Sequence, residues 1–167
     1  GVGTVPQLVV AQMLNQTGLK ADHVPYKGGA PALTDLRGGL IDFMSDSVPI
    51  VKGLLADGSI KPLGVSTMQR IPALPDIPTL DEQGVKNFDL QGYILLVAPS
   101  KTPEHIVIRL RNAVESIVKE PEVRNKLLEL GLTPMDLPQE QFSTFLQTQS
   151  MRWKAAVDAA GAAKSLQ

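Results

Sequence analysis

Apolar residues near the start of the chain recur at three- and four-residue spacing, which is typical of an amphipathic helix. The pattern Thr4 to Gln7 fits a capping box, so the helix is expected to begin there. It is expected to end at Gly18, because glycine readily adopts the left-handed conformation that closes a helix. The predicted apolar face consists of Val5, Leu8, Val9 and Met13.

Prolines predict the starts of the later helices, because the first turn of a helix needs no amide donor. Helices are expected to open near Pro31, Pro49, Pro103, Pro121 and Pro138.

Three prolines between residues 71 and 78 exclude a regular element there. After them, Thr79 and Glu82 form a second capping-box pattern, which predicts a short helix that ends at Gly84.

Short apolar or β-branched runs between these helices predict strands over residues 23–26, 40–44, 60–65 and 88–98. Helices and strands thus alternate up to residue 98, and helices follow. This order predicts an α/β fold with a parallel-rich sheet and C-terminal helices.

Composition narrows the class of protein further. Of 167 residues, 43% are hydrophobic, which allows a proper core, and 16 basic against 17 acidic residues leave a net charge of −1. Without a basic run, nucleic acid is not an expected partner. With no cysteine and only two histidines, neither a metal site nor a cofactor is expected. The longest apolar stretch is too short to span a membrane.

The residues that could bind a ligand lie in three loops that precede predicted helices, at residues 1–4, 26–31 and 45–47. A helix N-terminus favours an anion, so together the loops suggest a cleft for a small acid. Each loop also has a plainer interpretation. Thr4 can be only a helix cap, Lys27 only a solvated side chain, and Asp46 only the cap of the next helix.

Features of catalysis are scarce. The Gly-x-Ser-x-Gly motif is absent, and His23 and His105 stand in contexts that favour structural or surface roles. No enzymatic activity is therefore expected, although a small hydrolase that depends on either histidine remains an alternative.

Several motifs together carry a resemblance to a known family. They are Gly-x-Gly-Thr-x-Pro at 1–6, the run from His23 to Leu36 with its Tyr-Lys-Gly-Gly, Gly-Gly-x-Ile-Asp at 38–42, the connector at 70–79, Leu-x-Ala-Pro at 96–99 and Pro-Glu-Val-Arg at 121–124. The sequence resembles the substrate-binding proteins of tripartite tricarboxylate transporters, the Bug family of periplasmic receptors.

The resemblance implies a type II periplasmic-binding-protein fold, in which two lobes close like a Venus flytrap on a carboxylated ligand. Family members are about twice as long as this chain. Residues 1–90 would then be most of lobe two, and residues 91–167 a crossover strand and helices that pack on a missing N-terminal lobe. The implied function is capture of a di- or tricarboxylate, amino acid or aromatic acid in the periplasm, for the membrane components of the transporter.

The resemblance also implies which residues contact the ligand. Gly3 and Thr4 would hold a carboxylate of the ligand. Tyr26, Lys27 and Gly28 would shape the neighbouring loop, and Asp46 would face the cleft. Many family members have His at the position of Gln7 and Asn at that of Ser47, so the ligand need not be citrate. The six residues are Gly3, Thr4, Tyr26, Lys27, Gly28 and Asp46.

Two further expectations stay open. The effector domain of a LysR-type transcription regulator shares the two-lobe architecture and is the alternative function. Self-association is expected as well, because an apolar seam on the C-terminal helices would be exposed in the absence of the N-terminal lobe. That seam consists of Ile106, Leu110, Val114, Ile117, Phe142, Phe145 and Trp153.

Overall fold

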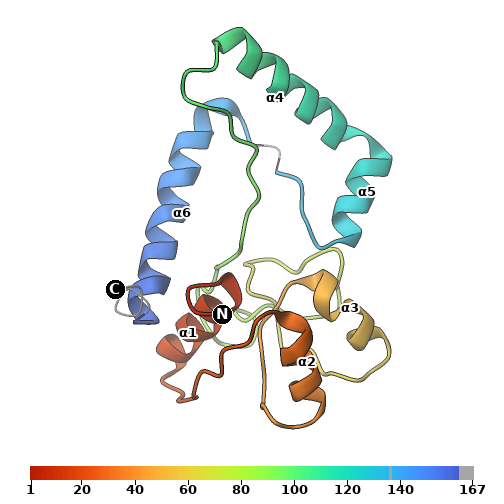
Figure 1. Ribbon diagram of the computed structural model, residues 1–167, viewed down its shortest axis with the longest axis vertical. Helices are drawn as coiled ribbons and strands as arrows, with labels where there is room; N and C mark the ends of the chain where they lie inside the picture. The colour runs from red at the N-terminus through yellow and green to blue at the C-terminus, as the bar shows by residue number, and fades with distance from the viewer. Residues whose placement is uncertain (136, 162–167) are drawn as a thin grey trace.

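The computed structural model describes residues 1–135 and 137–161, and the regular structure of that part is helical (Figure 1). Each helix begins within two residues of the proline expected in its first turn, so the predicted helix starts are confirmed. The helices are α1 (Val5–Thr17), α2 (Gly29–Arg37), α3 (Val48–Ala56), α4 (Glu104–Lys119), α5 (Pro121–Glu129) and α6 (Gln139–Ala159).

The predicted strands are wrong for the described residues. An isolated parallel bridge between Val65 and Thr79 is the one β-type pairing found there. The amide of Leu90 also donates to the carbonyl of Ser66 at 3.0 Å, but this contact does not extend into a ladder. A strand exists only through continuous pairing with a neighbour, which the apolar pattern of a segment cannot supply by itself.

Helices α1, α2 and α3 lie together in one half of the molecule, and α4, α5 and α6 lie around the periphery of the other half (Figure 1). An extended segment, residues 91–103, runs from the first half into the second. Helix α5 closes back onto α3, where Lys52 Nζ donates to the carbonyl of Glu129 at 3.3 Å. Helix α6 returns along the molecule and packs against α1.

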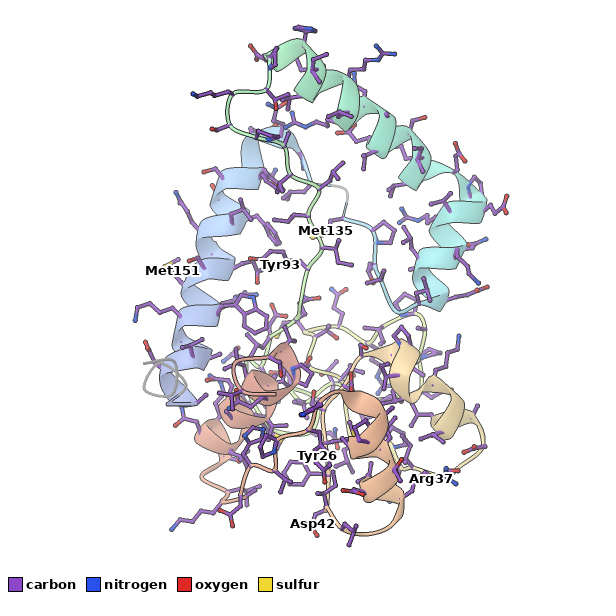
Figure 2. All side chains as sticks on the ribbon, in the orientation of Figure 1. Tyr26, Arg37, Asp42, Tyr93, Met135 and Met151 are labelled. Atoms are coloured by element: carbon purple, nitrogen blue, oxygen red, sulfur yellow. The ribbon has the colours of Figure 1, made fainter. Side chains whose placement is uncertain are left out.

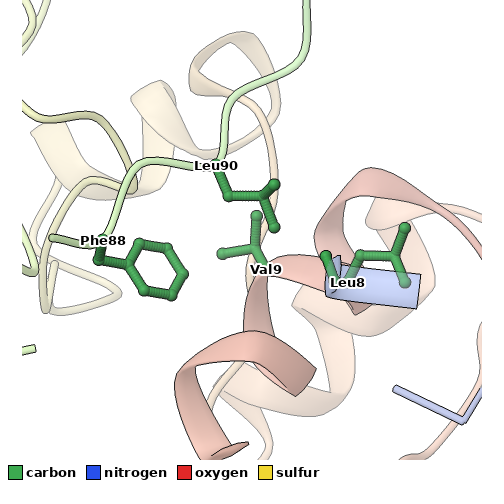
Figure 3. Packing of buried hydrophobic residues seen from close by; sticks show 5 residues of the cluster. Leu8, Val9, Phe88 and Leu90 are labelled. Carbon is green, nitrogen blue, oxygen red and sulfur yellow. The ribbon is translucent and has the colours of Figure 1, made fainter. Parts of the chain in front are cut away.

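The core lies where α1, the 88–90 segment and the C-terminal end of α6 meet (Figure 3). An ion pair between Arg152 and Asp89 fastens α6 to the same segment. Trp153 is partly buried and packs against this core, and its role in covering another lobe stays a prediction. The core therefore joins residues on both sides of position 90, while the division into 1–90 and 91–167 stays a prediction. Its buried members are Leu8, Val9, Phe88, Leu90 and Ala156.

The second capping box forms as its spacing predicts. The Thr79 amide donates to Glu82 Oε2 at 2.7 Å, and the Glu82 amide donates to Thr79 Oγ1 at 3.0 Å. Arg70 Nε adds a hydrogen bond to Glu82 Oε2 at 3.0 Å. The segment nonetheless closes as a turn rather than the predicted helix.

Because Glu82 accepts these hydrogen bonds as a carboxylate, the free energy of unfolding is expected to fall at acidic pH. The hydrogen bond from the Thr79 amide, followed by that from Arg70, lowers the pKa of Glu82 below its ordinary value of 4.5. The stabilisation is therefore present above that value and is lost as the pH falls through the lower pKa of the folded state. We expect Glu82→Gln to flatten the fall of the melting temperature below pH 4.5, measured by circular dichroism. Glu115→Gln, at an exposed position of α4, is the control. Equal acid sensitivity in both variants would contradict the assignment.

Candidate functional site

The first loop ends in an exposed helix N-terminus. Among the described residues, no partner is found for the amides of Val5 and Gln7 in the first turn of α1. The Gly3 amide, at a positive φ of 73°, donates to Gln7 Oε1 at 3.0 Å. The Thr4 hydroxyl donates to the carbonyl of Gly1 at 2.8 Å, and it does not accept the expected hydrogen bond from the Gln7 amide. The loop therefore offers free N–H groups at the positive end of a helix.

The second loop lies against the first. A side chain at Gly1 would come within 4.0 Å of the Tyr26 carbonyl oxygen, which shows how closely the two loops approach. Gly28 caps α2 with a φ of 132°, a conformation that favours glycine. Lys27 is exposed and forms no ion pair within the described part of the chain, so its charge is free for a ligand.

The phenol of Tyr26 is already engaged. It donates to Asp35 Oδ2 at 2.8 Å, and this bond, reinforced by burial, raises the pKa of Tyr26 above its usual 10.0. Tyr26 lies beside α2 (Figure 2), the helix that carries Asp35. Tyr26 thus has no proton left to donate to a ligand carboxylate. Its contribution to the site is to hold the loop against α2.

The third loop meets the second at Asp46. A Cβ added to Gly29 would lie 2.3 Å from Asp46 Oδ2, so the start of α2 and this carboxylate are in direct contact. Asp46 Oδ1 accepts from the amide of Ser47 at 2.7 Å. It makes no side-chain capping bond to the first turn of α3, where Ser47 is the N-cap residue. The interpretation of Asp46 as a helix cap is therefore not supported.

The three loops thus lie next to one another in sequence order, because a Cβ built on Gly1 would lie 4.0 Å from the Tyr26 carbonyl oxygen and Gly29 is in direct contact with Asp46. Together the loops at residues 1–4, 26–31 and 45–47 form one continuous surface, which is called the wall below. Two surface hollows of the described part, of about 510 and 290 Å³, lie along α6 and between α6 and α1, away from the loops. Within the described residues, no three metal-ligating side chains gather at one point.

Sequence reasoning missed three features of this region. Asp35 accepts the Tyr26 hydrogen bond and is only partly exposed. Gln7 occupies the Gly3 amide, and Gly29 is fixed by its contact with Asp46. The two consecutive glycines at 28–29 were a sequence signal for the close approach of Gly29 to Asp46. No sequence signal predicted the role of Asp35 or that of Gln7.

Comparison with known proteins assigns the family. The model for the tripartite tricarboxylate transporter family receptor matches residues 1–162, and the chain belongs to this family. A UPF0065 protein of Agrobacterium vitis, from the TAR-I ttuE-ttuC' intergenic region, is 37% identical over 81% of this chain and 39% of its own length. The UPF0065 protein of the clcB-clcD intergenic region of Pseudomonas knackmussii is 32% identical over 92% of this chain and 91% of its own.

Solved structures agree with this assignment. Rpa4515 of R. palustris with adipate has a TM-score of 0.81 and 32% identity, over 95% of this chain and 53% of its own. MatC of Rhodopseudomonas palustris with bound malate has a TM-score of 0.68 and 29% identity, over 92% of this chain and 53% of its own. These likenesses agree with the α/β fold of solute-binding proteins, even though the described residues here are helical.

The chain spans about half the length of most of these relatives, and nearly the whole of the Pseudomonas knackmussii protein. The family consists of receptors, and a periplasmic binding protein, BugD, is a further structural neighbour. The comparisons give no support to a LysR-type regulator. No helix in the described part of the chain has the length and apolar character to cross a membrane.

Proposed function

We propose that this chain supplies one wall of a carboxylate-binding site in a periplasmic solute receptor. The observation that carries the proposal is the set of adjoining loops at the starts of α1, α2 and α3, with free amides at Val5 and Gln7 and the unpaired cation of Lys27. Backbone donors and a positive helix end are the groups that hold a carboxylate. Adipate and malate, bound by two structural neighbours, belong to that chemical class.

Within this wall the residues have different roles. The free Val5 and Gln7 amides of the first turn of α1 receive one ligand carboxylate, and Lys27 neutralises it. Gly3 and Thr4 join them when the carboxylate takes the place of Gln7 Oε1 and of the Gly1 carbonyl as their acceptor. Gly28 gives the loop its conformation, and Tyr26 fixes that loop through Asp35. These roles deliver charge and donors without a reactive group, so the site binds its ligand and does not turn it over.

Asp46 has a different role, because its negative charge repels a second carboxylate placed directly beside it. It instead accepts a hydrogen bond from a hydroxyl or ammonium group of the ligand. This preference favours hydroxy acids and amino acids over simple dicarboxylates at that position.

The other wall would come from a polypeptide equivalent to the remaining half of the full-length relatives. The complete receptor would deliver its ligand to the membrane components of a tripartite tricarboxylate-type transporter. Because one wall provides only part of the contacts, we expect millimolar affinity for the chain alone.

Replacing Lys27 by methionine tests the proposal. Because the substitution removes the cation and keeps the length of the side chain, we expect Lys27→Met to weaken binding of adipate and malate several-fold. The measurement is ligand-observed NMR line broadening, and dimethyl adipate, which carries no charge, is expected not to bind.

Lys61→Met is the matched control, because Lys61 is an exposed lysine outside the three loops. Equal binding by the two variants, or the absence of any binding at millimolar acid, would contradict the proposed function. Micromolar affinity of the chain alone would contradict the idea of a single wall.

A further inference from the structure

The side chain of Gln7 occupies a backbone donor of the wall. Its Oε1 accepts from the Gly3 amide at 3.0 Å, so one N–H group that could hold a ligand carboxylate is already bound within the chain. The oxygen of the carboxamide, and not its nitrogen, must face Gly3, because an amide N–H needs an acceptor. Gln7 therefore presents to Gly3 the same type of atom that a carboxylate presents.

This bond differs from the usual capping contact of a helix. In a capping box, the side chain of the third helical residue returns to the amide of the N-cap residue. Gln7 is the third residue of α1 and Thr4 is its N-cap, but Gln7 binds Gly3, one residue earlier. The Thr4 amide donates instead to the carbonyl of Gly1 at 3.4 Å. The bond of Gln7 thus ties the first loop to α1 through the donor next to the cap.

A ligand acid can replace Gln7 at this donor. Both partners of the bond are neutral, Gly3 is exposed and Gln7 is only partly buried, so the bond contributes little net free energy in water. A carboxylate makes a charge-assisted hydrogen bond, which is about twice as strong as a neutral one. The positive end of α1 and the charge of Lys27 attract the acid further, and a neutral carboxamide gains little from either.

We propose that Gln7 is an internal competitor for the ligand carboxylate and thereby lowers the affinity of the site. The inference rests on the proposed function. Only the fraction of molecules in which Gln7 has left Gly3 binds with full affinity, so the apparent dissociation constant rises by the reciprocal of that fraction. For a neutral hydrogen bond the rise is about two- to tenfold. An acidic side chain at this position competes more strongly, because it binds Gly3 through a charge and repels the ligand acid.

Two substitutions at Gln7 test the inference in opposite directions. The dissociation constant of malate is measured by backbone amide NMR for the wild type and for each variant. We expect Gln7→Ala to bind malate about two- to tenfold more tightly and Gln7→Glu to bind it about tenfold more weakly, although both new residues favour a helix. Gln16→Ala is the matched control, because Gln16 is an exposed residue of the same helix outside the three loops, and it should bind as the wild type does.

Hydrogen exchange of the Gly3 amide supplies a measurement that needs no ligand. We expect this amide to exchange several-fold faster in Gln7→Ala than in the wild type or in Gln16→Ala. Equal exchange in the three proteins, weaker malate binding by Gln7→Ala, or one dissociation constant for the wild type and both Gln7 variants would each overturn the inference. Malate binding by the wild type would then leave the proposed function standing, whereas no binding by any of the proteins would overturn both.

Discussion

Replacing Phe88 with alanine is expected to remove a large part of the stability of this chain. Phe88 is 1% exposed and belongs to the core that joins α1 to α6. Deleting a buried phenylalanine ring costs about 3–5 kcal/mol, against a total of about 5–15 kcal/mol for a typical domain. This core has five buried members among the described residues, so the Phe88 ring is a large share of its buried apolar surface. The midpoint of urea unfolding, followed by circular dichroism, should fall sharply.

The control for this prediction is Phe142→Ala on α6. Phe142 is 39% exposed and lies outside the core, so truncation should change stability by about 1 kcal/mol or less. If both variants unfold at the same urea concentration, the core does not hold α6 against α1 as the structure indicates.

Replacing Gly29 with alanine is expected to disturb the second and third loops together. The new Cβ would lie 2.3 Å from Asp46 Oδ2 and 2.9 Å from Ile50 Cγ2, so both side chains must move. Asp46 cannot move freely, because its other oxygen accepts from the Ser47 amide. Overpacking of this kind costs about 1–3 kcal/mol, measured as a lower free energy of unfolding.

Gly53→Ala provides a matched comparison within α3. A Cβ at Gly53 meets nothing within 4 Å, and the position is inside a helix. Alanine should therefore stabilise the chain by about 0.5–1 kcal/mol. A Gly29→Ala variant as stable as Gly53→Ala would show that Gly29 and Asp46 are not in contact.

The helices could be predicted from the sequence because their signals are local. Proline in the first turn fixes the start, as at Pro121, where α5 begins. Glycine fixes the end, as at Gly18, which adopts a φ of 70° after α1. Neither signal depends on a distant part of the chain.

The strands and the packing could not be predicted in this way, because they depend on partners that are remote in sequence. Residues 93–98 have the composition of a buried strand, yet no ladder forms within the described part of the chain. Trp153 lies on an apolar face of α6, but the sequence does not say that this face meets α1.

The candidate site lies between these two cases. The glycines of its loops follow from the sequence, but the free Gln7 amide does not, because the capping-box pattern predicted that it donates to Thr4. The hydrogen bond between Tyr26 and Asp35, which removes the phenol from ligand binding, does not follow from the sequence either, since nine residues separate the two. The three helix starts already predicted a common cleft for a small acid, and the closeness of the loops at Gly1 and Gly29 gives that expectation a physical basis.

The central claim is that the starts of α1, α2 and α3 form a carboxylate-binding wall. A titration of the isotope-labelled chain with malate, followed by backbone amide NMR, tests it most directly. We expect the largest shifts at Gly3, Thr4, Val5, Gln7 and Gly28, with millimolar affinity and little change in α4 or α6. Shifts confined to α6 and its hollows, or no shifts at the three loops, would contradict the claim.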